Sequence, residues 1–172
     1  METWDAIRAR RNVRQYTAQP INRPDLERIL EAGRRAPSSG NWQPWNFVVV
    51  TDRDQLVELS KVWEVGGKHI ASSAATIALV GQAPEDERHR EWMLYDFGQA
   101  TANMMLEATD LGIGSGHSAV MDQEQAQRVL DFPDGYLCVY LIGLGYPADR
   151  PLRPIQKPNR RPFEEVVHWG RW

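Results

Sequence analysis

The sequence predicts a single globular domain in which helices and buried strands alternate along the chain. Its 172 residues are the size of one domain. The contents of 42% hydrophobic and 25% charged residues are typical of a soluble globular protein. Three runs of mostly apolar residues, at 46–50, 74–81 and 136–146, predict buried strands. A long helix is predicted over 86–111, where apolar residues recur every three or four positions.

The other elements follow from local signals. Residues 3–10 predict a short helix with Thr3 as its N-cap, and residues 23–35 predict a helix capped by Asn22 with Pro24 near its first position. Two more short helices are predicted at 53–62 and 122–130. The glycine-rich stretch 112–120 is interpreted as a crossover turn, in which His117 could face a pocket.

The helix at 86–111 is apolar over most of its circumference. Apart from the stripe formed by Leu94, Phe97 and Met104, neighbouring stripes carry Met93 and Ala100. A helix of this kind belongs in a core or in a subunit interface.

The last 26 residues, 147–172, have a different composition. Five prolines, beginning at Pro147 and ending at Pro162, exclude a helix or a central strand and predict an extended arm. The arm ends in PFEEVVHWGRW, whose apolar residues require burial. Two interpretations stay open: the arm reaches to a partner subunit, or it packs back on its own domain.

Composition also excludes several classes of protein. A net charge of -3 argues against bulk binding to nucleic acid or to an anionic membrane. No apolar stretch reaches the ~18 residues needed to span a bilayer, and the charged start METWDAIRARR lacks the apolar core of a signal peptide. The single Cys138, in an apolar segment, excludes an internal disulfide and predicts inert packing; no metal-binding spacing is present. We therefore expect a cytoplasmic protein.

The residues that remain available for chemistry suggest a planar, anionic ligand. Arginines cluster at 8–14 and again at 150–161, and guanidinium groups suit phosphate and carboxylate. The segment 37–45, PSSGNWQPW, offers hydroxyls, amides and two indole rings directly before a strand. Such groups can bind the edges of a cofactor ring, whereas the alternative is a structural turn. GIGSG lacks the strand-to-helix context of a dinucleotide loop.

Taken together, several segments resemble the nitroreductase-like family of flavoproteins. They are ARRNVRQY (9–16), RRAPSSGNWQPWNFVVV (34–50), ATDLGIGSG (108–116), YLIGLGYP (140–147) and RRPFEEVVHWGRW (160–172). The resemblance implies an α+β fold with a mixed, mainly antiparallel sheet flanked by helices, in one FMN-binding domain over 1–172. It further implies a homodimer with FMN at the interface, a long interface helix and an arm that embraces the partner.

The resemblance also implies an activity and the residues that serve it. In such enzymes NADH or NADPH reduces FMN by a ping-pong mechanism, and a small electron-poor acceptor (nitroaromatic, quinone or enone) is reduced next; no side chain is catalytic. By motif position, the residues implied to bind the cofactor are Arg10, Arg11, Asn12, Arg14, Pro37, Ser38, Ser39, Asn41, Ser118, Ala119 and either Arg160 or Arg161. Candidates for the substrate pocket are Trp42, His117 and Lys68.

One departure from the family pattern concerns the substrate. The stretch 81–91 is brief, so that the lid of longer members is largely missing and the site is expected to be open. Two alternatives share the fold: flavin fragmentation or reductive dehalogenation, and a non-catalytic protein that binds flavin or deazaflavin.

Overall fold

The computed structural model describes residues 1–172 and contains one four-stranded sheet. Its strands, in the order β1-β2-β4-β3, are β1 (Asn46–Val50), β2 (Ala75–Gln82), β4 (Tyr136–Gly145) and β3 (Gly114–Ala119). All three neighbouring pairs are antiparallel. The pairing is thus mainly antiparallel, as expected, and the one parallel pairing is an isolated bridge between Asn12 and Ser115.

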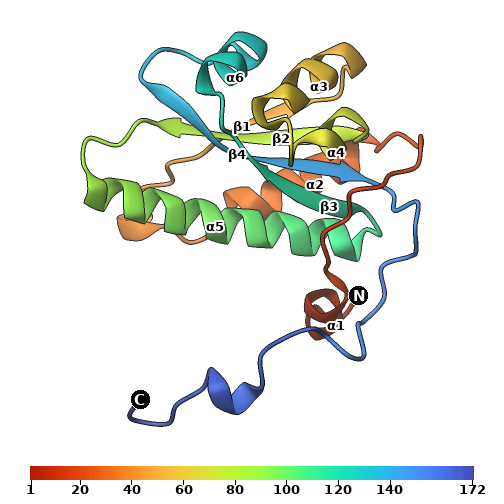
Figure 1. The fold of residues 1–172 in the computed structure, drawn as a ribbon. Helices are drawn as coiled ribbons and strands as arrows, with labels where there is room; N and C mark the ends of the chain where they lie inside the picture. Colours follow the sequence, from red (N-terminus) through yellow and green to blue (C-terminus); the bar gives the residue numbers. More distant parts are fainter.

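Helices cover both faces of this sheet (Figure 1). Helices α2 (Arg23–Arg34) and α5 (Glu87–Asp110) lie on one face, and α3 (Arg53–Ser60), α4 (Lys68–Ala71) and α6 (Gln123–Leu130) lie on the other. Each face has its own apolar core, with Ile29 and Met104 in the first and Leu56 and Ala126 in the second. No helix of the chain combines the length and the apolarity needed to cross a membrane.

Side-chain caps explain where most helices begin. Asn22, Asp52, Asp86 and Asp122 each accept a hydrogen bond from a backbone N–H in the first turn of the following helix. The short α4 and α1 (Thr3–Ala9) begin without such a cap, and in α1 the prediction of Thr3 as N-cap is wrong. The helix includes Thr3, its N-cap position is Glu2, and no side chain caps it.

The largest difference from the sequence prediction is β3, which occupies the segment interpreted as a glycine-rich turn. Glycine disfavours strands in general, yet close packing requires it here. A Cβ at Gly114 would approach the side chain of Val13 to 2.7 Å, and one at Gly116 would approach the carbonyl oxygen of Val13 to 2.5 Å. The N-terminal segment therefore packs directly on the backbone of β3, and His117 lies on a strand instead of a turn.

A second correction concerns β1, which was predicted to be buried throughout. It lies at the edge of the sheet, and only Val50 is fully buried, while Asn46 and Val49 are exposed. A continuous apolar run therefore does not show whether a strand is central or at an edge, because that depends on its neighbours.

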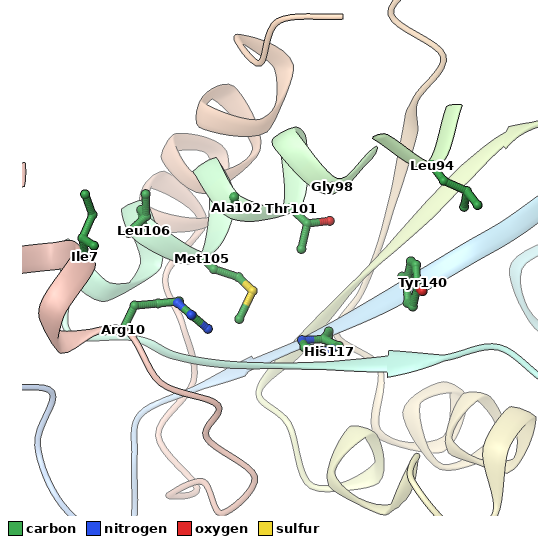
Figure 2. A pocket seen from close by; sticks show the side chains of 10 residues that line it. All are labelled: Ile7, Arg10, Leu94, Gly98, Thr101, Ala102, Met105, Leu106, His117 and Tyr140. Carbon is green, nitrogen blue, oxygen red and sulfur yellow. The ribbon is translucent and has the colours of Figure 1, made fainter. Parts of the chain in front are cut away.

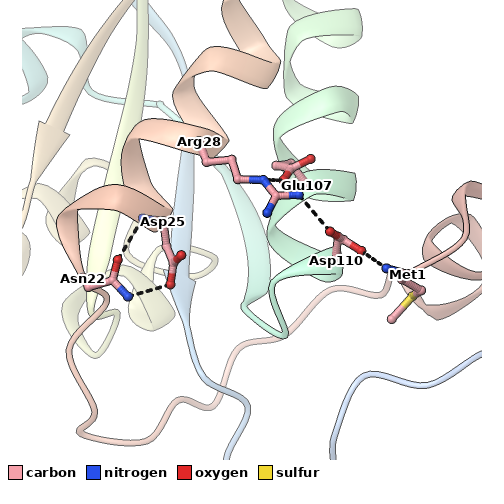
Figure 3. A network of polar contacts seen from close by, with 6 residues as sticks. All are labelled: Met1, Asn22, Asp25, Arg28, Glu107 and Asp110. Atoms are coloured by element: carbon pink, nitrogen blue, oxygen red, sulfur yellow. Dashed lines mark hydrogen bonds and ion pairs between the residues drawn. The ribbon is translucent and has the colours of Figure 1, made fainter.

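Polar contacts connect the N-terminus to α2 and α5 (Figure 3). The terminal ammonium of Met1 donates to Asp110 at the end of α5, and Arg28 of α2 contacts the second carboxylate oxygen of Asp110 at 3.1 Å. Arg28 also pairs with Glu107, one turn earlier in α5. Because Asp110 lies at the negative end of the helix dipole, these two cations compensate an otherwise unfavourable charge.

The C-terminal segment 147–172 is extended and lies over the end of α1 before it leaves the body of the protein (Figure 1). Backbone hydrogen bonds hold its first part, from Ala148 N–H to the Gln15 carbonyl and from Ile155 N–H to the Arg8 carbonyl. Its last part contains only the short 3-10 helix Phe163–Glu165, and Trp169 and Trp172 are 87% and 101% exposed. The arm therefore does not pack its apolar end back onto its own chain.

Candidate functional site

An open groove of about 470 Å³ lies between α5, α1 and the strands β3 and β4. Figure 2 shows the side chains directed into it, from the N-terminal helix on one side to the sheet on the other. The residues that line it are Ile7, Arg10, Leu94, Gly98, Thr101, Ala102, Met105, Leu106, His117 and Tyr140. None of them is acidic, so the groove combines apolar walls with a single cation.

Helix α5 supplies most of the wall because it is apolar on two sides. Phe97 and Met104 are buried in the core, whereas Leu94 is 39% exposed on the groove side. Gly98, also on the groove side, has no atom within 4 Å of the position that a Cβ would occupy, so the groove is open at this point. Of the two expected places for this helix, the core is confirmed for the side that carries Phe97 and Met104, whereas a subunit interface stays a prediction for the open side.

Arg10 lies where α1 ends, and its side chain enters the groove (Figure 2). Neither Arg10 nor the nearby Arg14 forms an ion pair with an acidic residue of this chain. Burial lowers the pKa of His117, and the positive charges of Arg14 and Arg10 lower it further. The positive charges of both arginines thus act on His117, which lines the groove, and they favour an anionic ligand there.

Arg11 differs from its neighbours because it contacts the arm. Its guanidinium donates to the Asp149 carboxylate at 2.7 Å and to the Arg150 carbonyl at 2.8 Å. The Arg11 side chain is only 13% exposed. In this chain Arg11 therefore fastens the beginning of the arm and does not point freely into the groove.

The remaining residues of this part of the predicted site lie along β3. Asn12 forms the bridge to Ser115, and the Val13 N–H donates to the Ser115 carbonyl. Ser118 is fully buried and its hydroxyl donates to the Ala119 carbonyl, so its side chain points away from the groove. Alternation along the strand therefore leaves His117 as the side chain that faces the groove.

The loop 37–43 lies elsewhere, beside the first half of α5. The buried Asp96 carboxylate accepts the Ser39 N–H at 2.9 and 3.1 Å and the Ser39 hydroxyl at 3.2 Å. The Ser38 hydroxyl accepts the Gln43 N–H, and Gln99 donates to the Pro37 carbonyl. In addition, Gly40, Asn41 and Gln43 have positive φ angles of 55°, 60° and 53°. This loop is thus held in one unusual conformation.

Trp42 extends from this loop to two aromatic side chains of α5. Its ring lies 6.3 Å from that of His89, which lies 5.4 Å from that of Trp92, and both pairs meet edge to face. Sequence reasoning missed His89 and Trp92, and it also missed Asp96 and Tyr140. Each of these is an ordinary helix or strand residue, and only the folded chain brings it to a candidate site.

Within one chain the predicted site residues thus form three separate groups. One group lines or borders the groove, the second is the loop 37–43, and the third is the arm. The Arg160 side chain donates to the carbonyl of its neighbour Asn159, while Arg161 pairs with Glu165 within the arm. Lys68 begins α4 on the surface and does not line the groove.

Comparison with known proteins connects this geometry to a family. The model of the nitroreductase family matches residues 7–65 and 62–146. A protein of Archaeoglobus fulgidus, provisionally named NADH dehydrogenase/NAD(P)H nitroreductase, is 32% identical over 170 residues, covering 96% of each chain. A Bacteroides thetaiotaomicron crystal structure with the same provisional name has a TM-score of 0.84 at 27% identity, covering 100% of this chain and 99% of that chain.

A longer relative has the same architecture. The NADPH:FMN oxidoreductase from Vibrio harveyi, crystallised with NAD+, has a TM-score of 0.83 at 25% identity, covering 97% of this chain and 76% of that chain. Fold and groove therefore define an α+β protein of the nitroreductase type. The chain belongs to the nitroreductase family and is an oxidoreductase. The fold that the sequence motifs implied is confirmed.

Proposed function

We propose that this protein is an FMN-dependent NAD(P)H oxidoreductase that acts as a homodimer on small, electron-poor acceptors. The observation that carries the proposal is the groove with apolar walls, no acidic residue, and the unpaired Arg10 with Arg14 close by. Its volume of about 470 Å³ falls within the range of small-molecule sites, roughly 300–1,000 Å³. A planar ring with a phosphorylated side chain matches this combination of apolar walls and cations. The FMN and NAD+ named for the Vibrio harveyi relative agree with it.

The residues of this chain would divide the binding of FMN as follows. Arg10 and Asn12 would contact the phosphate and the ribityl chain, and Arg14 would approach the pyrimidine end of the ring. The backbone of 118–119 would face the reactive edge of the ring. When bound, FMN supplies the hydride chemistry, accepting a hydride from NADH or NADPH and transferring it to the acceptor.

The protein groups would orient the ring and tune its charge. Arg14 near the pyrimidine end would stabilise negative charge on the reduced ring. Leu94 and Met105 would keep water from one part of the groove. Only a few residues separate β2 from α5, so this connection is too short to form a lid over the groove. Reductant and acceptor would therefore use the same open face in turn.

The proposal requires a second copy of the chain, because the loop 37–41 and the arm lie away from the groove of their own chain. Pro37, Ser38, Ser39 and Asn41 would complete the site of the partner, as would Arg160 or Arg161. The exposed residues Trp4, Ile7, Tyr95, Phe163 and Trp169 supply apolar surface for such an interface. An obligate dimer of this kind would bury well over ~2,000 Å² in total.

The first test is a visible spectrum of the purified protein, combined with its mass in solution. We expect a flavin spectrum, one FMN per chain and a dimer. Oxidation of NADH and NADPH is then measured with a quinone and with a nitroaromatic. Turnover with either acceptor supports the oxidoreductase, whereas bound flavin without turnover supports a carrier. A protein that binds no FMN contradicts the proposal.

A further inference from the structure

The side chain of His69, on α4, is buried against the face of the sheet where β3 and β4 pair. Its Nδ1 lies 3.1 Å from the Gly66 carbonyl oxygen and its Nε2 lies 3.0 Å from the Gly116 carbonyl oxygen. A Cβ at Gly116 would come within 3.2 Å of the imidazole ring, and one at Gly143 within 3.3 Å. The ring therefore lies against strand backbone, and the side chain is almost closed off from solvent.

A neutral imidazole ring has too few N–H groups for the two partners of His69. Both partners are carbonyl oxygens, which only accept hydrogen bonds. A neutral imidazole has one N–H, so one ring nitrogen would face a carbonyl oxygen without a proton between them. Only the imidazolium form can donate to Gly66 and Gly116 together.

Surrounding groups oppose that second proton. Burial lowers the pKa of His69, and the positive charges of Arg14 and of protonated His117 lower it further, although both backbone hydrogen bonds raise it. Tyr16, from the N-terminal segment, is neutral, and its single hydroxyl proton is shared between the Val13 carbonyl at 2.8 Å and the Gly143 carbonyl at 3.0 Å. Lys68 adds another positive charge next in sequence. None of these groups is an acid that is charged at neutral pH.

We infer that His69 is a positioning residue that takes up a proton when an anionic group binds beside Arg14. The bound negative charge offsets that of Arg14 and so removes one of the effects that oppose the imidazolium, the form that donates to both carbonyl groups. One of these belongs to Gly116, next to His117 in the groove. Ligand binding therefore fastens the strand that forms one wall of the site. That an anion binds beside Arg14, and that this anion is FMN, rests on the proposed function.

The position of β3 explains how protonation of His69 can stabilise this wall of the groove. Strand β3 lies at the edge of the sheet, with β4 on one side. The N-terminal segment at Val13 donates to the Ser115 carbonyl of this strand, and the ring of His69 lies 3.0 Å from its Gly116 carbonyl oxygen. A charge-assisted hydrogen bond is stronger than a neutral one, so protonation adds a firm contact at this edge. The same N-terminal segment carries Arg14. The anion beside Arg14 and the proton on His69 would therefore lie on neighbouring elements of the same site.

The experiment follows the protonation of each histidine directly. Protein labelled with ¹⁵N at its histidines is titrated by NMR between pH 5 and 8, first without ligand, then with saturating sulfate, then with FMN. Sulfate is used because it remains a dianion over this range, and chloride at equal ionic strength is the control. The signals of the four histidines are assigned by replacing each with glutamine in turn, so that His69 is identified even if H69Q does not fold.

Without ligand, we expect His69 to titrate below 6.5, its ordinary value. Sulfate and FMN should each raise its midpoint by about one pH unit, an effect typical of a nearby charge. The variant R14Q should raise the midpoint without any ligand and remove the response to sulfate. The matched variant R23Q, on the exposed face of α2, should behave as the wild type.

The outcomes separate this inference from the proposed function. A response to sulfate without binding of FMN supports the role of His69 and contradicts the FMN proposal. Binding of FMN, seen by its fluorescence, with an unchanged His69 midpoint overturns the role of His69 and leaves the cofactor in place. If neither ligand moves the midpoint, or R14Q titrates as the wild type does, the inference is wrong.

Discussion

The Asp96 carboxylate, fully buried in α5, holds the backbone N–H of Ser39 with both of its oxygens. No cation of this chain pairs with Asp96, so its buried oxygens depend on the hydrogen bonds from Ser39 and from Gln99. The buried oxygens of Asp96 need hydrogen-bond donors, and the loop 37–43 needs an acceptor to keep its conformation, so each stabilises the other. This contact fixes the segment that we expect to complete the partner's site.

Asp96→Asn should destabilise the protein by roughly 1–3 kcal/mol, because the amide NH₂ would face the Ser39 N–H and leave a buried donor unpaired. Ser39→Ala removes only the hydroxyl bond and should cost about 1 kcal/mol or less. Urea unfolding measures both values. Glu91→Gln, on the exposed side of the same helix, is the matched control. Equal stability of Asp96→Asn and wild type would show that the loop does not depend on this carboxylate.

Arg10 and Arg11 are adjacent in sequence but should behave differently. Arg10→Ala should weaken FMN binding by roughly 1.5–3 kcal/mol, the range for hydrogen bonds to a charged group, with little change in stability. A fluorescence titration of the apoprotein measures the affinity, with the exposed Arg23→Ala as control. Unchanged affinity in Arg10→Ala would remove this arginine from the site.

For Arg11, the ion pair with Asp149 predicts a structural effect. Arg11→Ala and Asp149→Ala should lower the melting temperature by similar amounts, and the double variant should not add the two, because both break one contact. Differential scanning calorimetry compares the three proteins. If Arg11→Ala loses FMN while Asp149→Ala keeps it, Arg11 contacts the phosphate directly instead of the arm.

The first part of the arm is hydrogen-bonded to the N-terminal segment and its last part is exposed, so a truncation can separate the two. A chain that ends after Lys157 keeps the contacts of Ala148 and Ile155 but lacks the exposed aromatic end and both Arg160 and Arg161. We expect this chain to fold, to dissociate into monomers and to lose FMN, as measured by light scattering and by flavin absorbance. The full-length double variant R160Q/R161Q should remain a dimer but bind FMN more weakly. A truncated dimer that retains FMN would assign the arm no role in the site.

The N-terminal ammonium gives a prediction for the pH dependence of stability. Its hydrogen bond to Asp110 raises its pKa above the ordinary value of 8.0. The folded state therefore binds this proton more tightly than the unfolded state, so the contribution is present below pH 8 and is lost as the pH rises through the folded value. The melting temperature should fall between pH 8 and 10 more steeply in wild type than in Asp110→Asn. Parallel curves would contradict this.

Cys138 lies in the middle of β4 and is fully buried. Burial raises the pKa of its thiol to about 12, so almost no thiolate is present at neutral pH. The folded protein should not react with Ellman's reagent within minutes, whereas the unfolded protein should release one equivalent. Cys138→Ala should retain FMN and activity. Rapid labelling of the folded protein together with loss of activity would make this residue functional.

The sequence alone was sufficient to predict the elements whose signals are local. The helix at 23–35, for example, was predicted from its Asn22 cap and from apolar residues at a spacing that places Leu26 and Ile29 on one face, and both are buried. Three of the four strands were predicted from continuous apolar runs. The family motifs also implied the fold correctly, and they carry the cofactor residues that stay predictions.

Only the tertiary structure decided the features that depend on residues far apart in sequence. The glycines of β3 predict a turn when considered alone, and they form a strand because Val13 and His69 pack on them without space for a Cβ. The same applies to Asp96, which meets Ser39 across 57 positions. Local sequence determines which conformations a segment prefers, but the free energy of burial, hydrogen bonding and charge depends on what the folded chain places beside it.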